Sequence, residues 1–258
     1  MSAHTYTVDN LTPTQVAGFI DHALLRPDMT VEEVIAGCNL CATYKAFSVC
    51  VKPCDVKLAS DTLKGTGVAV GTVISFPHGN SSTSVKVAES LQALEDGAAE
   101  LDMVMNIGHM KSSLYKEIET EIHQVVTQAK QKNPKVIVKV IFECALLTSE
   151  EIKKACELST AAGADFVKTS TGFSTGGAKL PDLVLMRAST PSTVQVKASG
   201  GIRDLDYMIE CLNVGCTRIG CSGTKAIVEE LLARQQNPSY KAEPAQKNTA
   251  AAAPGSDY

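Results

Sequence analysis

The sequence predicts an α/β protein built as a single closed (β/α)8 barrel, the TIM-barrel architecture. Between residue 20 and about residue 235, short β-branched runs alternate with amphipathic stretches, and Gly, Pro or a capping residue marks each change. The alternation gives eight strand and helix pairs. No G-x-G-x-x-G motif follows the first strand, so we favour a closed barrel, with an open doubly wound sheet as the alternative.

The eight expected strands share a short apolar core that is rich in β-branched residues. In chain order they are residues 20–24, 46–51, 67–75, 100–106, 135–143, 165–170, 194–199 and 217–222. Helical stretches separate every neighbouring pair. Two of these helices have capping-box spacing at their start, where a threonine precedes a glutamate by three residues: Thr30 with Glu33, and Thr148 with Glu151.

Two further helical signals complete the architecture. An extra N-terminal helix is expected before the first strand, with Thr12 as its cap and Pro13 at its first position. The helix after the fourth strand has apolar residues spaced by three or four, which predicts one face packed on the sheet. These residues are Leu114, Ile118, Ile122 and Val125.

We expect one catalytic barrel domain over residues 1–235 and a flexible tail over residues 236–258. A chain of 258 residues with 44% hydrophobic content can bury one large core, although two domains are also compatible with this length. After residue 235 large apolar residues are scarce, so burial cannot offset the entropy of ordering the chain. The tail is therefore predicted to be disordered.

Composition excludes several classes of partner. The net charge is −4 and no cluster of Lys or Arg offers a nucleic acid or membrane surface a basic patch. The N-terminus lacks a secretory pattern and no apolar stretch is long enough to span a bilayer, so we expect a cytoplasmic protein. The nine cysteines are odd in number and lie in apolar patterns, which predicts reduced thiols.

Four of these cysteines resemble zinc ligands only superficially. Cys38 and Cys41 lie in a helical pattern, whereas Cys50 and Cys54 lie in and beside a strand. Structural zinc normally takes its cysteine pairs from tight turns. We therefore predict no metal site.

The most informative feature is a pair of lysines at matching places on neighbouring strands. Lys168 lies in "FVKTSTGF" (166–173) and Lys197 in "VQVKASGGIR" (194–203), both near the carboxyl ends of strands. In a barrel these ends surround the active site. At about 6 Å, with an effective dielectric near 20, the two charges repel by roughly 3 kcal/mol.

Repulsion of that size lowers the pKa of one lysine by about two units, and burial lowers it further. An unprotonated amine can attack a carbonyl carbon and form a Schiff base. The pair therefore predicts a nucleophilic lysine. The alternative for either lysine is a structural role, with its ammonium group paired to a carboxylate.

Acid and base chemistry is assigned to the fourth and fifth strands. Asp102 occupies the corresponding place on the fourth strand and is expected to transfer protons through a water, while Lys139 helps to keep it ionised. A purely structural ion pair between Asp102 and Lys139 is the alternative.

Small residues follow the last three strands and predict a phosphate site. Glycine lets backbone amides approach oxygens closely, and a helix start favours negative charge. Glycines that serve only turn geometry are the alternative. The residues in question are Thr171, Gly172, Gly200, Gly201, Gly220, Ser222 and Gly223.

Together these motifs resemble the deoxyribose-phosphate aldolases, a family of class I aldolases. The likeness runs from about Ile20 to Ile227 and is carried by "FVKTSTGF", "VKASGGIR", "ELDMVMNIG", "GTVISFPHG" and "KVIFE" in the family's order. The resemblance implies reversible cleavage of 2-deoxy-D-ribose 5-phosphate to glyceraldehyde 3-phosphate and acetaldehyde, in deoxynucleoside breakdown. It implies no cofactor and no metal, and by analogy a homodimer or higher homo-oligomer.

By position, the resemblance makes Lys168 the Schiff-base lysine, Lys197 its pKa-lowering neighbour and Asp102 the proton-transfer residue, supported by Lys139. Asp21 is implied in contacts with substrate hydroxyls. The phosphate pocket is implied to comprise Gly172, Gly200, Gly201, Gly220 and Ser222. Arg203 either adds charge there or is structural.

Other positions are more specific to this chain. Some relatives place a lysine where Phe173 stands and a second serine where Gly223 stands, so backbone amides are expected to carry more of the phosphate binding here. The resemblance to relatives with a terminal tyrosine in the site makes Tyr258 a candidate catalytic residue that assists proton transfer, with a solvated end residue as the alternative. Cys50 is either a thiol that unsaturated aldehydes trap or an inert buried cysteine.

Two rival functions remain. A Schiff-base aldolase for a different phosphosugar would use the same lysine chemistry with another pocket shape. An inactive barrel that binds sugar phosphates as a regulator belongs to a different class, and the complete set of Lys168, Lys197 and Asp102 argues against it.

Overall fold

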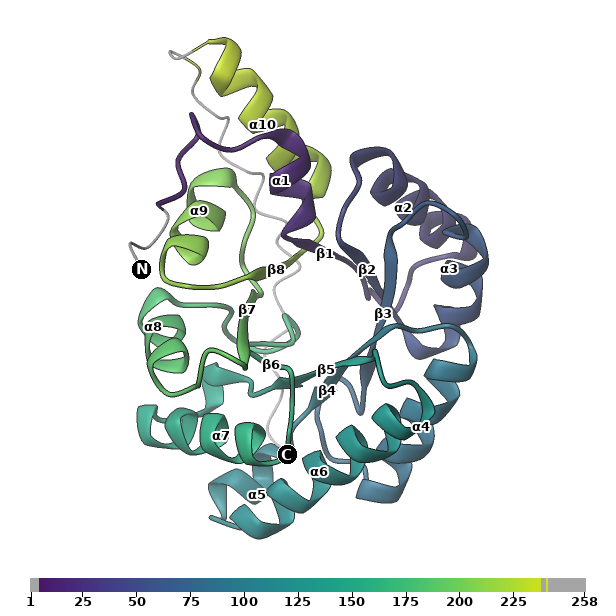
Figure 1. Cartoon of the computed structure of the whole chain (residues 1–258), viewed down its shortest axis with the longest axis vertical. Coiled ribbons are helices and arrows are strands. Elements are labelled where there is room, and N and C mark those ends of the chain that lie inside the picture. Colours follow the sequence, from purple (N-terminus) through teal and green to yellow (C-terminus); the bar gives the residue numbers. More distant parts are fainter. Residues whose placement is uncertain (1–4, 238–239, 241–258) are drawn as a thin grey trace.

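The computed structural model, which describes residues 5–237 and 240, is a closed barrel of eight parallel strands. Each strand pairs with the next, and β8 closes the ring against β1. In Figure 1 the strands surround the centre and the helices lie outside them. The strands are β1 Ile20–Leu24, β2 Ser48–Val51, β3 Ala69–Ile74, β4 Glu100–Val104, β5 Ile137–Ile141, β6 Phe166–Lys168, β7 Gln195–Ser199 and β8 Arg218–Cys221. Each lies within its predicted segment, which confirms the predicted barrel.

In the described part of the chain, each strand is followed by one or more helices. They are α2 Val31–Tyr44, α3 Val56–Thr62, α4 Thr83–Glu95, α5 Ile107–Lys111, α6 Tyr115–Lys132, α7 Ser149–Ala161, α8 Leu180–Ala188, α9 Leu205–Asn213 and α10 Thr224–Gln236, with one-turn 3-10 helices η1 Pro53–Asp55 and η2 Cys144–Leu146. The extra helix α1 Pro13–Gly18 precedes β1 and lies beside α10 (Figure 1). The predicted tail lies outside the described residues, apart from residues 236, 237 and 240.

The predicted caps are present. Thr12, Thr30 and Thr148 each accept a hydrogen bond from the backbone amide three residues later, and the side chains of Gln15, Glu33 and Glu151 return a contact to the cap. Pro13 stands at the first position of α1, where its missing N–H leaves no helical hydrogen bond unmade. Local sequence therefore fixes where three of the helices begin.

One part of the predicted helical face is wrong. Ile118, Ile122 and Val125 on α6 are fully buried, but Leu114 precedes the helix and is 40% exposed. The reason is the short helix α5, which the sequence analysis did not predict, and the left-handed turn at Ser113 (φ 58°) that separates α5 from α6. This turn carries Leu114 off the apolar stripe.

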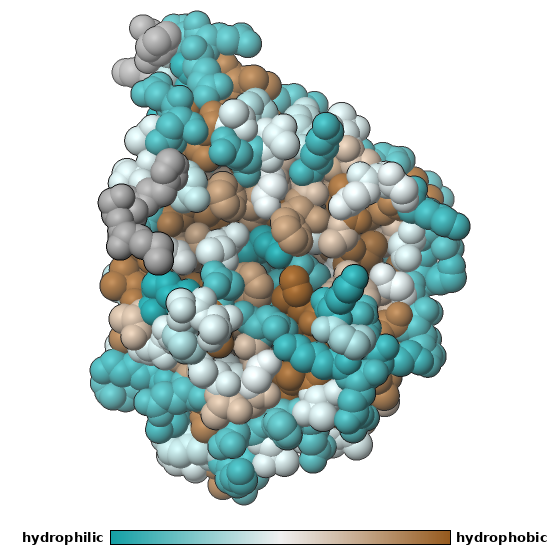
Figure 2. Space-filling view, in the orientation of Figure 1, coloured by the Kyte–Doolittle hydropathy of each residue, from teal (hydrophilic) through white to brown (hydrophobic). Residues whose placement is uncertain are grey.

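The fold has two buried regions: an apolar layer between the strands and the helices, and a charged region inside the ring of strands. The main hydrophobic core packs the outer faces of the strands against the helices, as Val49, Val138 and Ile219 do against residues of the surrounding helices. Inside the barrel, by contrast, charged side chains from opposite strands meet. Figure 2 shows that hydrophilic residues dominate the rim of the face in view, while hydrophobic residues gather toward its middle.

No helix among residues 5–237 is both long enough and apolar enough to cross a membrane. All nine cysteines are unpaired, as predicted. Within the same residues no cluster of three or more potential ligands is placed to hold a metal ion.

Candidate active site

A buried network of seven charged side chains fills the barrel interior. Glu100 on β4 contacts Arg218 on β8 at 3.1 Å, and Lys197 on β7 contacts Asp21 on β1 at 2.5 Å. These strands are not neighbours in the sheet, so the contacts cross the inside of the barrel. The network comprises Asp21, Glu100, Asp102, Lys139, Lys168, Lys197 and Arg218.

Asp102 is the centre of this network. Its Oδ2 accepts hydrogen bonds from the Nζ of Lys168 and of Lys197, both at 2.8 Å, and its Oδ1 accepts one from Lys139 Nζ at 2.7 Å. Burial raises the pKa of Asp102, but the three lysines outweigh burial and hold the pKa well below its ordinary value. The prediction that Lys139 helps to keep Asp102 ionised agrees with this geometry.

The two lysines that share Asp102 have opposite pKa shifts. Because both nitrogens contact one oxygen, they lie no farther apart than twice 2.8 Å. Burial lowers the pKa of Lys168, and repulsion from Lys197 lowers it further, against the attraction of Asp102. Burial also lowers the pKa of Lys197, but Asp102 and Asp21 together raise it above its ordinary value. Lys168 therefore loses its proton more readily than Lys197, and its nitrogen lone pair is the more available for attack on a carbonyl.

The lowered pKa of Lys168 has a different main cause from the one predicted. Repulsion between the two lysines was expected to be the main cause, whereas burial is the larger one. The network also explains why an uncharged Lys168 is favourable. With Lys168 neutral, the three carboxylates of the network face three cations, so no net charge is buried.

The sequence analysis missed two members of the network, Glu100 and Arg218. Arg218 Nη2 contacts Glu100 Oε1 at 3.1 Å, and its guanidinium carbon lies 3.4 Å from the ring centroid of Phe47. Glu100 also accepts a hydrogen bond from Lys139 at 2.7 Å. The alternation of side chains along a strand could have identified Glu100. It precedes Asp102 by two residues on β4, so both side chains face the inside of the barrel.

Asp21 lies deeper in this network than its predicted role suggested. Its Oδ1 accepts hydrogen bonds from Ser48 Oγ at 2.6 Å and from Arg218 Nη1 at 2.5 Å. Burial opposes its ionisation, but Lys197, Lys139 and Arg218 lower its pKa. Asp21 lines the cavity described next, so a substrate hydroxyl contact stays a prediction.

A cavity of about 520 Å³ opens at the carboxyl ends of the strands, directly above the lysines. Nine of the predicted site residues line it: Asp21, Lys168, Thr171, Gly172, Lys197, Gly200, Gly201, Gly220 and Ser222. Cys50, Phe173 and Arg203 also line the cavity, whereas Asp102 and Lys139 lie in the network beneath it. Gly223 is outside the lining, and Tyr258 lies outside the described residues.

Two glycines on the cavity lining allow neighbouring atoms to approach closely because they lack a side chain. Gly200 has a left-handed backbone (φ 85°), and a Cβ there would lie 3.0 Å from Gly177 Cα. A Cβ on Gly220 would lie 2.8 Å from Ser199 Cβ and 3.2 Å from Lys197 Cε. Gly220 therefore keeps the space that Lys197 occupies.

Phe173 and Cys50 also line the cavity, and neither side chain carries a charge at neutral pH. Phe173 is 44% exposed and its ring meets that of Phe76 edge to face, with centroids 5.2 Å apart. An apolar pair thus stands where some relatives have a lysine. Burial and the charge of Asp102 raise the pKa of Cys50 to about 11, so its thiol is protonated at neutral pH.

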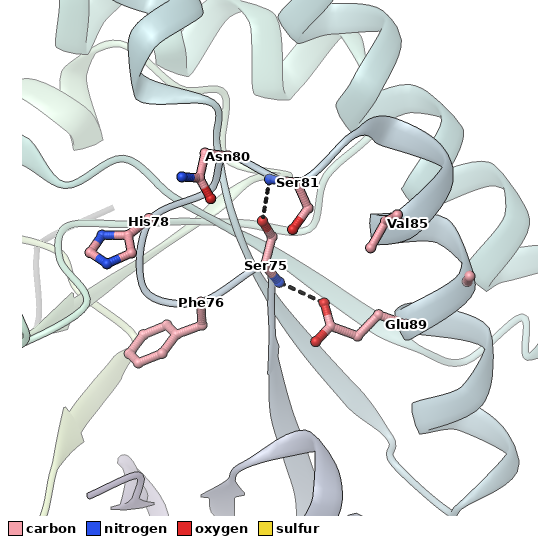
Figure 3. Close-up of a pocket in the computed structure, with 8 residues that line it drawn as sticks. Ser75, Phe76, His78, Asn80, Ser81, Val85 and Glu89 are labelled. Atoms are coloured by element: carbon pink, nitrogen blue, oxygen red, sulfur yellow. Dashed lines mark hydrogen bonds between the residues drawn. The ribbon is translucent and has the colours of Figure 1, made fainter. Parts of the chain in front are cut away.

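A second hollow, of about 390 Å³, lies in the loop between β3 and α4 (Figure 3). There Ser75 donates its amide to Glu89 at 2.7 Å and accepts a hydrogen bond on Oγ from the Ser81 amide at 3.1 Å. Its lining contains no lysine and no member of the charged network, so it lacks the chemistry of the first cavity. Phe76 connects the two through its contact with Phe173.

Comparisons with a family model and with known proteins all identify aldolases. Residues 15–223 match the family described as DeoC/LacD family aldolase. A deoxyribose-phosphate aldolase of Clostridium tetani is 49% identical over 216 residues, which cover 84% of this chain and 99% of that protein. A deoxyribose-phosphate aldolase of Thermococcus kodakarensis is 48% identical over 217 residues, covering 83% of this chain and 96% of that protein.

A solved structure agrees with these sequence matches. The deoxyribose phosphate aldolase of Aeropyrum pernix, described as having a unique tetrameric structure, is 31% identical with a TM-score of 0.80, covering 88% of this chain and 95% of that one. The family match spans the barrel and every residue of the charged network. The chain belongs to the DeoC/LacD family of aldolases and is a carbon–carbon lyase.

Proposed function

We propose that this aldolase reversibly cleaves 2-deoxy-D-ribose 5-phosphate into D-glyceraldehyde 3-phosphate and acetaldehyde through a Schiff base on Lys168. The observation that carries the proposal is the buried Lys168 amine on the cavity wall, with a lowered pKa and 2.8 Å from Asp102. The relatives named as deoxyribose-phosphate aldolases supply the substrate class.

The proposed reaction uses Lys168 as the nucleophile and Asp102 as the proton carrier. The lone pair of Lys168 attacks the aldehyde carbon, and loss of water gives an iminium. The bond between C2 and C3 breaks as the C3 hydroxyl loses its proton, and the electron pair passes to the iminium to form an enamine. Asp102, through a water, serves as the proton carrier, and protonation at C2 followed by hydrolysis releases acetaldehyde.

We assign the phosphate to the glycine-rich part of the cavity lining. Gly172, Gly200 and Gly201 border the cavity there, and Ser222 precedes the start of α10, at Thr224. Backbone amides at glycine turns and at a helix start favour a dianion. Arg203 lies on the same lining, whereas Phe173 offers no charge, so we assign most of the phosphate binding to the amides.

We also propose a cellular compartment and an oligomeric state for this protein. Nine unpaired cysteines support a reducing, cytoplasmic compartment. The tetramer of the Aeropyrum pernix relative supports a homo-oligomer. A role in deoxynucleoside breakdown follows from the substrate.

The test compares substrates and traps the intermediate. We expect purified protein to cleave 2-deoxyribose 5-phosphate with a higher kcat/KM than other phosphosugars. Borohydride added with acetaldehyde should leave one reduced two-carbon adduct, which peptide mass spectrometry places on Lys168. An unmodified protein, or an adduct confined to another lysine, contradicts the Schiff-base assignment, and faster cleavage of another phosphosugar contradicts the substrate.

A further inference from the structure

Glu143 is a buried carboxyl beside the cavity that the proposed mechanism does not use. It follows β5 with a left-handed backbone (φ 58°) and is only 2% exposed. The flanking amides of Phe142 and Cys144 donate to the carbonyls of Lys168 and Thr169 at 3.0 and 2.9 Å. Glu143 is thereby held against the loop that follows the Schiff-base lysine.

Its carboxyl group is directed at Thr171. Oε2 of Glu143 accepts hydrogen bonds from the Thr171 hydroxyl and from the Thr171 amide, the latter at 3.3 Å. Oε1 is buried and has no hydrogen-bond partner within the described part of the chain. Burial raises the pKa of Glu143, against the hydrogen bonds from Thr171 and the charge of Lys168.

These contacts fix the direction of the Thr171 hydroxyl. With Glu143 ionised, both of its carboxylate oxygens can only accept hydrogen bonds. The Thr171 hydroxyl therefore donates its own proton to Oε2 while Glu143 is ionised. Its oxygen also accepts a hydrogen bond from the Phe173 amide at 3.0 Å.

A hydroxyl has one donor and two acceptor positions, so only one acceptor position remains on Thr171. Thr171 lines the cavity and, in the chain, stands between Lys168 and Gly172, which line it as well. A phosphate dianion offers acceptors only and cannot satisfy this position. A hydroxyl group on the substrate, which can donate, does satisfy it.

We propose that Glu143 is a positioning residue that locks Thr171 as a hydrogen-bond acceptor, so that Thr171 selects a substrate hydroxyl between the aldehyde carbon and the phosphate. The inference deepens the proposed function and rests on it. It also separates Thr171 from the phosphate-binding set in which the sequence first grouped it.

The first test asks which substrate group Thr171 contacts. Thr171→Val should lower kcat/KM about 10- to 100-fold for 2-deoxyribose 5-phosphate. This is the range expected for loss of a hydrogen bond to a hydroxyl that itself donates to a carboxylate. The loss should be of similar size with 2-deoxyribose, which has the hydroxyls but no phosphate. Thr171→Ser retains the hydroxyl and should recover most of the activity. A loss that vanishes with 2-deoxyribose assigns Thr171 to the phosphate and overturns the proposal.

The second test asks whether Glu143 acts through Thr171. Glu143→Leu should lower kcat/KM about tenfold or more in the Thr171 background and should have little further effect in the Thr171→Val background. Glu143→Gln keeps an amide oxygen as acceptor and should restore most of the activity. Additive effects of Glu143→Leu and Thr171→Val overturn the coupling.

Folding and the parent proposal are controlled separately. Thermal unfolding of each variant shows whether a loss is one of structure, and Thr171→Ser with Glu143→Gln carries the test if the apolar variants unfold. Wild-type protein that cleaves neither substrate refutes the proposed function itself. Wild-type protein that cleaves both, with additive variants, refutes only the role of Glu143.

Discussion

Replacing Lys168 by methionine is expected to lower kcat/KM by about 10⁴-fold or more, because no other side chain supplies the nucleophile. The variant should also form no reduced adduct with acetaldehyde. Its fold should persist, since Asp102 keeps hydrogen bonds to Lys139 and Lys197 and the methionine fills the space of the aliphatic stem. Steady-state cleavage and adduct mass measure the two effects.

Lys168→Arg is the matched control for this variant. Arginine keeps a positive charge beside Asp102 but stays protonated in proteins, so it cannot act as a nucleophile. It should be as inactive as the methionine variant. Activity within tenfold of wild type in either variant would show that Lys168 does not carry the reaction.

The second large effect is expected from Lys197→Leu. Loss of Lys197 removes a repulsive charge and leaves Asp102 with fewer partners, and both changes raise the pKa of Lys168. The reaction requires unprotonated Lys168, so the acidic limb of the profile of kcat/KM against pH moves to higher pH. At pH 7 we expect kcat/KM to fall about 10²-fold, the loss of free amine that a repulsion of roughly 3 kcal/mol between the two lysines implies.

This variant should also be less stable, because Asp21 and Asp102 lose a buried partner, at a cost of about 3 to 5 kcal/mol. Lys197→Arg keeps the charge and should leave the acidic limb near its original position even if turnover falls. A limb that does not move in Lys197→Leu refutes the electrostatic role of Lys197.

The sequence was sufficient for the architecture because each signal was local. Capping threonines and alternating β-branched runs act over a few residues, so Thr30, Thr148 and the eight strands could be located in advance. Lys168 and Lys197 were identified for a similar reason, since both stand next to small-residue turns at strand ends. Leu114 was misplaced because the turn at Ser113 interrupts the helical period.

The charged network could be predicted only in part, because it depends on which strands face each other across the barrel. Arg218 and Glu100 meet from β8 and β4, and no sequence spacing indicates that contact. The same geometry decides the pKa shifts. Without that geometry, repulsion was expected to lower the pKa of Lys168 more than burial does, whereas the deep burial of Lys168 is the larger cause. Glu143 was overlooked because its partner, Thr171, lies on the next strand's loop.

Schiff-base formation depends most directly on the pKa of the Lys168 amine in the free enzyme. It can be measured by following lysine side-chain ¹⁵N resonances with pH, the Lys168 signal being the one that Lys168→Met lacks. We predict that this resonance titrates below the ordinary lysine range, whereas that of Lys197 titrates above it. A Lys168 resonance that titrates at or above the ordinary lysine value contradicts the account.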